Sequence, residues 1–367
     1  MLTEDTSRMT ISGQTDRQTD ITVIIPVYNC REYLAEAVSS VLSQPYQRIR
    51  IVLIDDGSTD GSGRICDELG LKNSRITVLH QKNAGVSAAR NAGIVYALQN
   101  ETSMERKHYL AFLDADDCWT EEFFDNATVD ALPETAIIRF RSAKCNSHLT
   151  NCTVSKCVKN GIYAGGAQTV GMCLGSHFGA ALYAASILRN HSIRFVEGMK
   201  NSEDVLFLRT CVYNAETITM DNRVLYLYRN NPASCVHAGR KYGFTHFEPM
   251  LQAYMQHDFN GTGFVAWYFV DAIEEHFRFG GTVPDAVHWM QQHETYVDIA
   301  REYGGSRAEK VLATLEKHPY RYAIPRRIKG VAYRIMRYLV HIPPLATLTD
   351  LLRYREKIPN YRKECPN

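Results

Sequence analysis

The sequence predicts an α/β fold in which helices flank a Rossmann-like, mostly parallel sheet. Within the first 120 residues, short apolar runs bounded by turn residues recur, as expected for parallel strands that are buried on both faces. Segments with apolar residues at helical spacing separate these runs. Three of the runs end in polar loops, at 28–29, 55–62 and 114–117. This alternation of strands and helices favours a doubly wound sheet.

Four strands and three helices are expected to alternate in the first half of the chain: strand 21–26, a helix near 31–43, strand 50–54, a helix containing Ile65 and Leu69, strand 76–79, a helix at about 87–98 and strand 109–113. A further helix is expected near 119–129, with Asp117 as its N-cap. Segments 136–140 and 180–183 are candidate strands.

Helical patterns dominate after about residue 240. One of them, 264–279, stops at Gly280–Gly281, and another begins at a capping box, Ser306–Glu309. The expected organisation is a disordered polar tail at 1–20, an α/β domain at 21–236 and a helical region at 237–367.

The composition is typical of a soluble globular protein, with 45% hydrophobic and 22% charged residues. The first 20 residues lack the apolar stretch of a signal peptide, and no apolar run approaches the roughly 20 residues that a membrane span needs. The ten cysteines include no CxxC pair, and the spacing of Cys145, Cys152 and Cys157 fits no usual zinc site. We therefore expect reduced thiols, no zinc and a cytoplasmic location.

The C-terminal segment is strongly basic. Residues 321–363 contain eleven Lys and Arg against two acids, a local charge of +9, so the remainder carries −8. Six aliphatic residues of segment 324–342 fall on one helical stripe: Ile324, Ile328, Val331, Ile335, Leu339 and Ile342. A basic amphipathic helix of this kind can bind an anionic membrane surface, which would place the protein at the inner face of the cell membrane. It can equally pack on its own domain with its basic face in solvent.

Asp114, Asp116 and Asp117 follow the fourth predicted strand. In extended backbone, positions i and i+2 point to the same side, so Asp114 and Asp116 can face one ligand. Mg²⁺ and Mn²⁺ prefer such oxygen donors. Asp55 and Asp56 end the second strand at the same edge of the sheet, and five carboxylates there indicate a cation and a phosphorylated ligand.

Two further loops have the residues of a nucleotide site. In 55–62 (DDGSTDGS), a carboxylate can accept from a base or a ribose, although a capped turn without a ligand explains the same pattern. In 83–93 (NAGVSAARNAG), Gly85 permits an unusual backbone angle. Arg90 can either pair with a carboxylate of this edge or hold the nucleotide.

In order and spacing, these loops resemble the family 2 glycosyltransferases, which have the GT-A fold. The matching segments are IIPVYN (24–29), DDGSTD (55–60), NAGVSAARNAG (83–93) and DADD (114–117), followed by Glu203–Asp204 and by YLYR (226–229). The resemblance covers about residues 21–235 and makes the α/β domain a nucleotide-sugar-binding catalytic domain. The QxxRW motif of processive members is absent, so the chain resembles the non-processive bacterial type, which adds a single sugar.

The resemblance implies a role for individual residues. The donor-binding set would be Pro26, Val27, Tyr28, Asp56, Asn83, Arg90, Asp114, Ala115 and Asp116. Within this set, Pro26–Tyr28 and Asp56 would hold uracil and ribose, Asp114 would contact the ribose, and Asp116 would ligate a Mn²⁺ or Mg²⁺ ion at the diphosphate. Asp204 would be the general base, with Glu203 beside it in the acceptor pocket.

The implied activity is inverting, metal-dependent transfer of one sugar, of the hexosyltransferase type, from a UDP-sugar to a glycan or lipid-linked glycan in surface polysaccharide synthesis. A carboxylate within reach can take the proton of the acceptor hydroxyl, and a cation offsets the charge that develops on the diphosphate. Acids also favour the first turn of any helix, so Glu203–Asp204 has a structural alternative. No nucleic-acid partner is expected.

Two rival functions stay open at this point. One is a non-catalytic nucleotide-sugar-binding assembly protein, which would keep the donor loops and lose the base. The other is a nucleotidyltransferase, which would need a Gly-rich, Arg-containing loop where this chain has Val27–Tyr28–Asn29. The isolated His177, His191 and His237 are expected to be structural or exposed rather than metal ligands.

Overall fold

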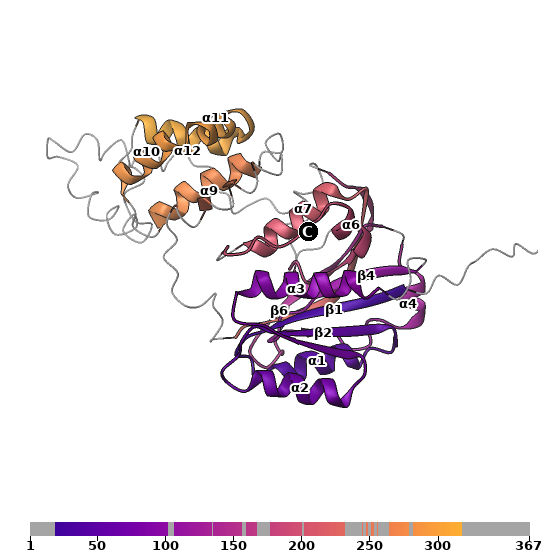
Figure 1. Ribbon diagram of the computed structural model, residues 1–367. Coiled ribbons are helices and arrows are strands. Elements are labelled where there is room, and N and C mark those ends of the chain that lie inside the picture. The colour runs from indigo at the N-terminus through magenta and orange to yellow at the C-terminus, as the bar shows by residue number, and fades with distance from the viewer. Residues whose placement is uncertain are drawn as a thin grey trace, which may run out of the picture. The chain divides into compact units, whose positions relative to one another are not determined.

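The computed structural model describes residues 19–101, 106–133, 135–155, 159–166, 177–199, 202–231, 264–278 and 282–317, with a few further residues between 244 and 255. The chain divides into two compact units, Met1–Ala238 and Gly239–Asn367. The described part of the first contains a mixed sheet of ten strands with helices on both faces, and the described part of the second is helical (Figure 1). The predicted α/β fold class is confirmed.

The N-terminal half of the sheet is parallel. It contains β1 (Thr19–Val27), β2 (Ile49–Asp55), β3 (Ile76–His80) and β4 (Lys107–Phe112), in the order β3-β2-β1-β4. Helices α1 (Leu34–Leu42) and α2 (Ser62–Lys72) cover one face, and α3 (Val86–Gln99) covers the other (Figure 1). The chain thus changes face between β3 and β4, which makes the carboxyl ends of β1 and β4 the switch point where ligands of such sheets bind.

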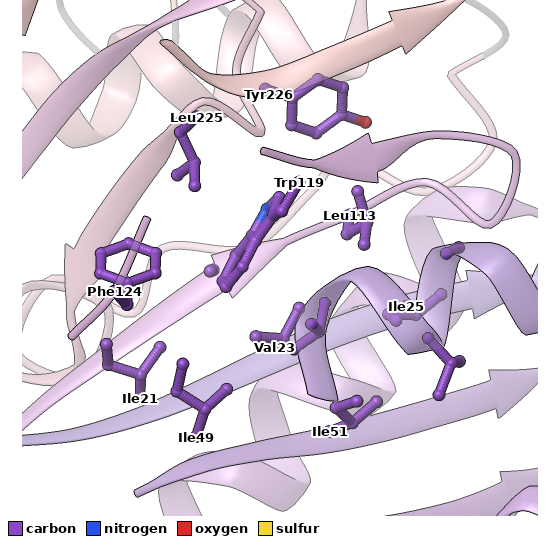
Figure 2. Packing of buried hydrophobic residues seen from close by; sticks show 14 of the residues in the cluster. Ile21, Val23, Ile25, Ile49, Ile51, Leu113, Trp119, Phe124, Leu225 and Tyr226 are labelled. Atoms are coloured by element: carbon purple, nitrogen blue, oxygen red, sulfur yellow. The ribbon is translucent and has the colours of Figure 1, made fainter. Parts of the chain in front are cut away.

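The two faces of β1 are buried differently. Ile21, Val23 and Ile25 belong to the core on the α1 side, where the indole of Trp119 lies among Val23, Phe124 and Leu225 (Figure 2). Ile24 faces α3, because successive side chains of a strand alternate between faces. A Cβ atom on Gly93 of α3 would lie 2.5 Å from Cγ2 of Ile24, so this glycine allows the helix to pack closely on the sheet.

The second half of the sheet is mainly antiparallel. It contains β9 (Ala181–Ala184), β6 (Ile137–Cys145), β10 (Thr217–Arg229) and β5 (Cys118–Trp119), with β7 (Thr153–Val154) beside β6 and β8 (Gly161–Ala164) beside β10. Of these neighbours, β6 and β10 run parallel. The helices of this part are α4 (Asn126–Asp130), α6 (Ala185–Asn190) and α7 (Glu203–Asn214). The candidate strands 136–140 and 180–183 are confirmed as β6 and β9.

The helix expected at 119–129 is wrong. Trp119 lies in β5, paired antiparallel with Tyr226 of β10, because its large side chain is buried in the core. Helix α4 begins only at Asn126, and Asp125, not Asp117, caps it by accepting from the N–H of Thr128 at 2.7 Å.

The prediction that Cys145 and Cys152 are reduced is also wrong, because they form a disulfide. The side chain of Asn146 orders the intervening turn, and its Oδ1 accepts from the N–H groups of His148 at 3.1 Å and Thr150 at 2.8 Å. Four other cysteines among the described residues are free: Cys30, Cys66, Cys118 and Cys211.

The described part of the second unit consists of α9 (Phe264–Arg278), α10 (Val283–Gln292), α11 (Glu294–Tyr303) and α12 (Gly305–Lys317), with α11 and α12 packed on α9. The helix predicted at 264–279 is confirmed. The predicted capping box does not start α12, because Ser306 already lies within the helix.

Two sequence predictions fall elsewhere. The basic segment 324–342 and residues 1–18 of the predicted tail lie outside the described residues, while Thr19 and Asp20 already belong to β1. Among the described helices, none combines the length and the apolar character that crossing a bilayer requires.

Candidate active site

The loops after β1 and β2 are joined at the carboxyl edge of the sheet. The N–H of Cys30 donates to Oγ of Ser62 at 2.9 Å, and the N–H of Arg31 donates to Oδ2 of Asp60 at 3.0 Å. Pro26 and Val27 are buried at the end of β1, whereas the ring of Tyr28, the next residue, is 50% exposed. Tyr28 therefore offers a free aromatic surface at this edge.

Asp56 organises the loop after β3. Its carboxylate accepts from Nε2 of Gln81 at 2.7 Å and from the N–H groups of Ala84 and Gly85, each at 2.9 Å. Gly85 has φ 90°, a conformation that favours glycine, and it begins α3. A carboxylate has about four lone-pair sites, so Asp56 retains capacity for one more donor. Asn83 lies exposed in the same loop.

Arg90 joins three elements of the site. It lies in α3 and is 4% exposed. Its Nη2 donates to Oδ1 of Asp114 at 2.7 Å, and its Nη1 donates to Oε1 of Glu203 at 3.1 Å. The guanidinium also lies over the ring of Phe178, 4.6 Å from the centroid. Of the two roles left open by the sequence, the structure shows pairing with carboxylates.

The acidic turn, residues 114–117, follows β4. Ala115 is buried, and Asp117 is almost fully so. The Asp117 carboxylate accepts from the hydroxyl of Tyr226 at 2.6 Å and from the N–H of Arg229 at 2.7 Å. The Asp116 carboxylate accepts from Nδ2 of Asn231 at 3.1 Å. The end of β10 therefore holds the acidic turn in place.

The three acids of this turn titrate differently. Burial, the largest effect, would raise the pKa of Asp114, but the charges of Arg90 and His177 together with hydrogen bonds from Arg90 and Tyr226 hold that pKa below its usual value. Burial, followed by the negative charge of Asp114, raises the pKa of Asp116. Burial and the charges of both neighbours raise the pKa of Asp117 well above its usual value. The surroundings of Asp116 and Asp117 thus favour the protonated form of both groups.

His177 lies against the acidic turn. Its ring stacks on Tyr226 with 4.4 Å between centroids, and its Nε2 lies 3.8 Å from Oδ2 of Asp114. Burial lowers the pKa of His177 to about 4, so the imidazole is neutral at physiological pH. Nδ1 accepts from the N–H of Gly179 at 3.2 Å, which leaves the proton on Nε2, facing Asp114.

The carboxylates of this turn fit a divalent cation. Within the described part of the chain, Asp114, Asp117 and His177 place potential ligand atoms within 4.8 Å of one another, and this group does not include Asp116, the ligand that the resemblance implies. Carboxylate oxygens suit Mn²⁺ and Mg²⁺. The imidazole fits less well, because its Nε2 carries a proton in the arrangement seen here. A cation here would also offset the charge that raises the pKa of Asp116 and Asp117.

Asp204 lies beside the Arg90 ion pairs, in the first turn of α7. Ser202, which precedes the helix, has φ 60°, and Glu203 is held by Arg90. Burial, followed by the negative charge of Glu203, raises the pKa of Asp204 to about 6. A partly buried carboxyl group with this pKa can accept a proton near neutral pH.

Hydrogen bonds of Arg90 and Asp56 connect several of the predicted residues. Arg90 connects Asp114 to Glu203, which precedes Asp204, and Asp56 anchors the start of the helix that carries Arg90. Sequence reasoning assigned no site role to His177, Tyr226, Arg229 or Asn231. Tyr226 and Arg229 belong to the YLYR segment, whose resemblance to the family was the one sequence signal that could have indicated a role for them.

A cavity lies at the opposite edge of the sheet, at the amino ends of the parallel strands. It has a volume of about 490 Å³ and is lined by the starts of β4 and β10, including Lys107 and Thr217, together with α6. Because parallel strands carry their ligands at the carboxyl ends, this cavity is separate from the acidic turn.

Residues 22–140 match the family "Glycosyl transferase family 2". The glycosyltransferase GlyG of Streptococcus pneumoniae serotype 4 is 42% identical over 106 residues, which are 29% of this chain and 33% of GlyG. The minor teichoic acid biosynthesis protein GgaB of Bacillus subtilis (strain 168) is 38% identical over 110 residues, 31% of this chain and 11% of GgaB. The matched stretch thus spans a third or less of these relatives' length.

A solved structure resembles nearly the whole chain. S. aureus TarS 1–349 in complex with UDP-GlcNAc has a TM-score of 0.55 and 18% identity, and the alignment covers 92% of this chain and 89% of TarS 1–349. At this identity the likeness concerns the fold.

Proposed function

We propose that this chain, which carries a family 2 glycosyltransferase domain of the GT-A fold, moves one sugar from a UDP-sugar to a hydroxyl of a glycan or lipid-linked glycan in surface polysaccharide synthesis. Two comparisons support the donor and the acceptor class. TarS, which shares the fold, was solved with UDP-GlcNAc, and GgaB is named for teichoic acid biosynthesis.

The observation that carries the proposal is the environment of Asp204. Burial and Glu203 raise its pKa to about 6, the range in which a carboxylate is charged at neutral pH and still basic enough to accept a proton. Arg90 ties Glu203 to Asp114, so this base is held one ion pair away from the acidic turn. Asp204 would take the proton of the acceptor hydroxyl as the oxygen attacks the anomeric carbon. Attack opposite the leaving diphosphate gives inversion.

The donor would lie along the ends of β1, β2 and β4. Tyr28 offers an exposed ring for the uracil, and Pro26, Val27 and Asn83 would shape the base pocket. Asp56 would order the loop after β3 and would accept one further donor from the nucleoside. Ala115 leaves the turn compact, so that Asp114 can face the ribose.

Asp116 would be the principal cation ligand of the acidic turn, with Mn²⁺ or Mg²⁺ as the ion. When bound, the cation would stabilise the charge that develops on the diphosphate. In the Asp116→Ala variant we expect weaker Mn²⁺ binding and weaker metal-dependent donor binding, measured by titration. A titration curve identical to that of the wild type would remove this role.

The test of the activity uses the full chain with Mn²⁺ and a panel of nucleotide sugars. A transferase should stabilise on binding its donor and should release UDP slowly without an acceptor, whereas a binding protein should release none. Asp204→Asn should abolish transfer and preserve the thermal shift with donor. Asp298→Asn, an exposed acid of α11, is the matched control. Normal turnover by Asp204→Asn would refute the base assignment.

A further inference from the structure

Arg229, the last residue of β10, is a buried cation in which each of the three guanidinium nitrogen atoms donates a hydrogen bond. Its side chain is 3% exposed. Nε donates to the carbonyl of Asp116 at 2.6 Å, Nη1 donates to the carbonyl of Ser147 at 2.5 Å, and Nη2 donates to Oε2 of Glu36 at 2.5 Å. The guanidinium also lies over the ring of Tyr33, 4.8 Å from the centroid.

These contacts join separate parts of the fold. Glu36 and Tyr33 belong to the region of α1, and Ser147 lies in the loop between β6 and β7. Burying a guanidinium is costly unless its donors are satisfied. Its planar fork reaches these partners at once, which the single ammonium of a lysine cannot do.

Arg229 and Asn231 together hold the main chain and the side chain of Asp116. Arg229 holds the main-chain carbonyl of Asp116, and Asn231 donates to its carboxylate at 3.1 Å. The N–H of Arg229 holds the neighbouring Asp117 at 2.7 Å. With its main-chain carbonyl and one carboxylate oxygen held in this way, the side chain of Asp116 has little freedom to reorient.

We propose that Arg229 is a positioning residue that presents the Asp116 carboxylate to a divalent cation, with Asn231 as its partner. The inference deepens the proposed function, since it concerns the cation of the same site. Preorganised ligands bind a cation more tightly because less freedom is lost on binding. All three nitrogen atoms of the guanidinium donate to protein atoms, so the proposed role acts through Asp116.

The experiment measures Mn²⁺ affinity of the full chain without any sugar donor, from the electron paramagnetic resonance signal of free Mn²⁺. Arg229→Lys keeps the charge and loses the fork, and we expect the dissociation constant to rise about tenfold or more. Asn231→Ala removes one hydrogen bond to Asp116 and should raise it about threefold. Arg223→Lys, at an exposed arginine of the same strand, should match the wild type.

A second readout separates positioning from a general loss of fold. Thermal unfolding in excess EDTA should leave the Asn231→Ala variant within a few degrees of the wild type, so that a weaker affinity cannot come from unfolding. If Arg229→Lys does not fold, the Mn²⁺ affinity of Asn231→Ala alone tests the proposal. Wild-type Mn²⁺ affinity in any folded variant of this pair, or no Mn²⁺ binding by the wild type, would overturn the proposal. Mn²⁺ binding with the expected losses but without sugar transfer would refute only the proposed function.

Discussion

Asp204 has neighbours with opposite effects on its charge. Glu203 raises its pKa and Arg90 lowers it, while burial, the largest effect, favours the protonated form. Arg90 also donates to Glu203. It therefore orients the Glu203 carboxylate and limits the rise in the pKa of Asp204. The balance gives Asp204, the proposed base, a pKa of about 6.

The pH dependence of transfer should follow this group. Asp204 is protonated below its pKa of about 6 and cannot then act as the base. We expect kcat/KM to rise about tenfold per pH unit below pH 6 and to level off above pH 7. Initial rates between pH 4.5 and 8 at saturating Mn²⁺ would test this. A profile that is flat down to pH 5 would contradict it.

The same shift has a consequence for stability. Because the folded-state pKa of Asp204 lies above its value in the unfolded chain, its proton stabilises the fold at low pH, and this stabilisation is lost as pH rises through about 6. Asp204→Asn removes that loss, so its melting temperature should exceed that of the wild type at pH 8 and equal it near pH 4. A lower melting temperature of Asp204→Asn at pH 8 would show that the charged carboxylate of Asp204 does not destabilise the folded protein.

Some residues of the site could be predicted from the sequence and others could not. Asp114 and Asp116 could be placed because the carboxyl ends of parallel strands share one edge of the sheet. His177 and Asn231 had no comparable signal, since each is a single polar residue outside a predicted helix or strand. Strand β9 follows His177 and strand β10 precedes Asn231, and the pairing of both strands with β6 brings both residues to the site. Arg229 stood in a recognised segment, but the pattern does not reveal that its partners are two main-chain carbonyls and the carboxylate of Glu36.

At the scale of elements, α3 depends on close contact with the sheet. A Cβ on Gly93 would lie 2.5 Å from Cγ2 of Ile24 and 3.0 Å from Cδ1 of Ile54. Gly93→Ala should therefore push the helix outward and lower the free energy of unfolding by about 1–3 kcal/mol. Arg90 lies one turn earlier on α3, so donor binding should weaken as well.

Chemical denaturation of the full chain would measure this effect. Val95→Ala, on the exposed side of the same helix, is the control and should change stability by about 0.5 kcal/mol or less. Equal stability of both variants would mean that α3 adjusts without cost.

The disulfide closes the loop that contains Ser147, one of the partners of Arg229. Closing so short a loop contributes roughly 2.5 kcal/mol in the chain-entropy account. The Cys145→Ser/Cys152→Ser variant should lose about that much stability, and reductant should destabilise the wild type and leave the variant unchanged. Peptide mapping of protein purified without reductant would check the link, and free thiols at both positions would contradict it.

Elements were predicted best where the chain alternates regularly. β1 to β4 were recognisable because strands buried on both faces read as continuous apolar runs. The segment after Asp117 was not, because Trp119 and Phe124 suit a helix and a strand equally until β10 supplies the partner. The link between Cys145 and Cys152 likewise depends on a turn between strands that the spacing alone does not reveal.

For the whole molecule, the candidate site lies entirely within the first unit, so the second unit needs a separate explanation. Its described helices pack on one another, with Phe269 and Ile273 of α9 fully buried. The charge is divided unevenly along the chain, since residues 321–363 carry +9 and the remainder −8. Such a division suits a protein that binds an anionic surface, which is the role predicted for segment 324–342.

Membrane docking through the basic segment remains a prediction from the sequence alone. A Lys or Arg near an anionic bilayer contributes about 1 kcal/mol, and the aliphatic stripe of 324–342 would add burial in the interface. The full chain should therefore sediment with phosphatidylglycerol vesicles and not with phosphatidylcholine vesicles, and binding should weaken as salt is raised. A chain lacking residues 321–367 should lose this binding while its melting temperature still responds to Mn²⁺ and donor. Equal partitioning of both chains would reject the docking role, and loss of the donor response would show instead that the segment packs on the protein.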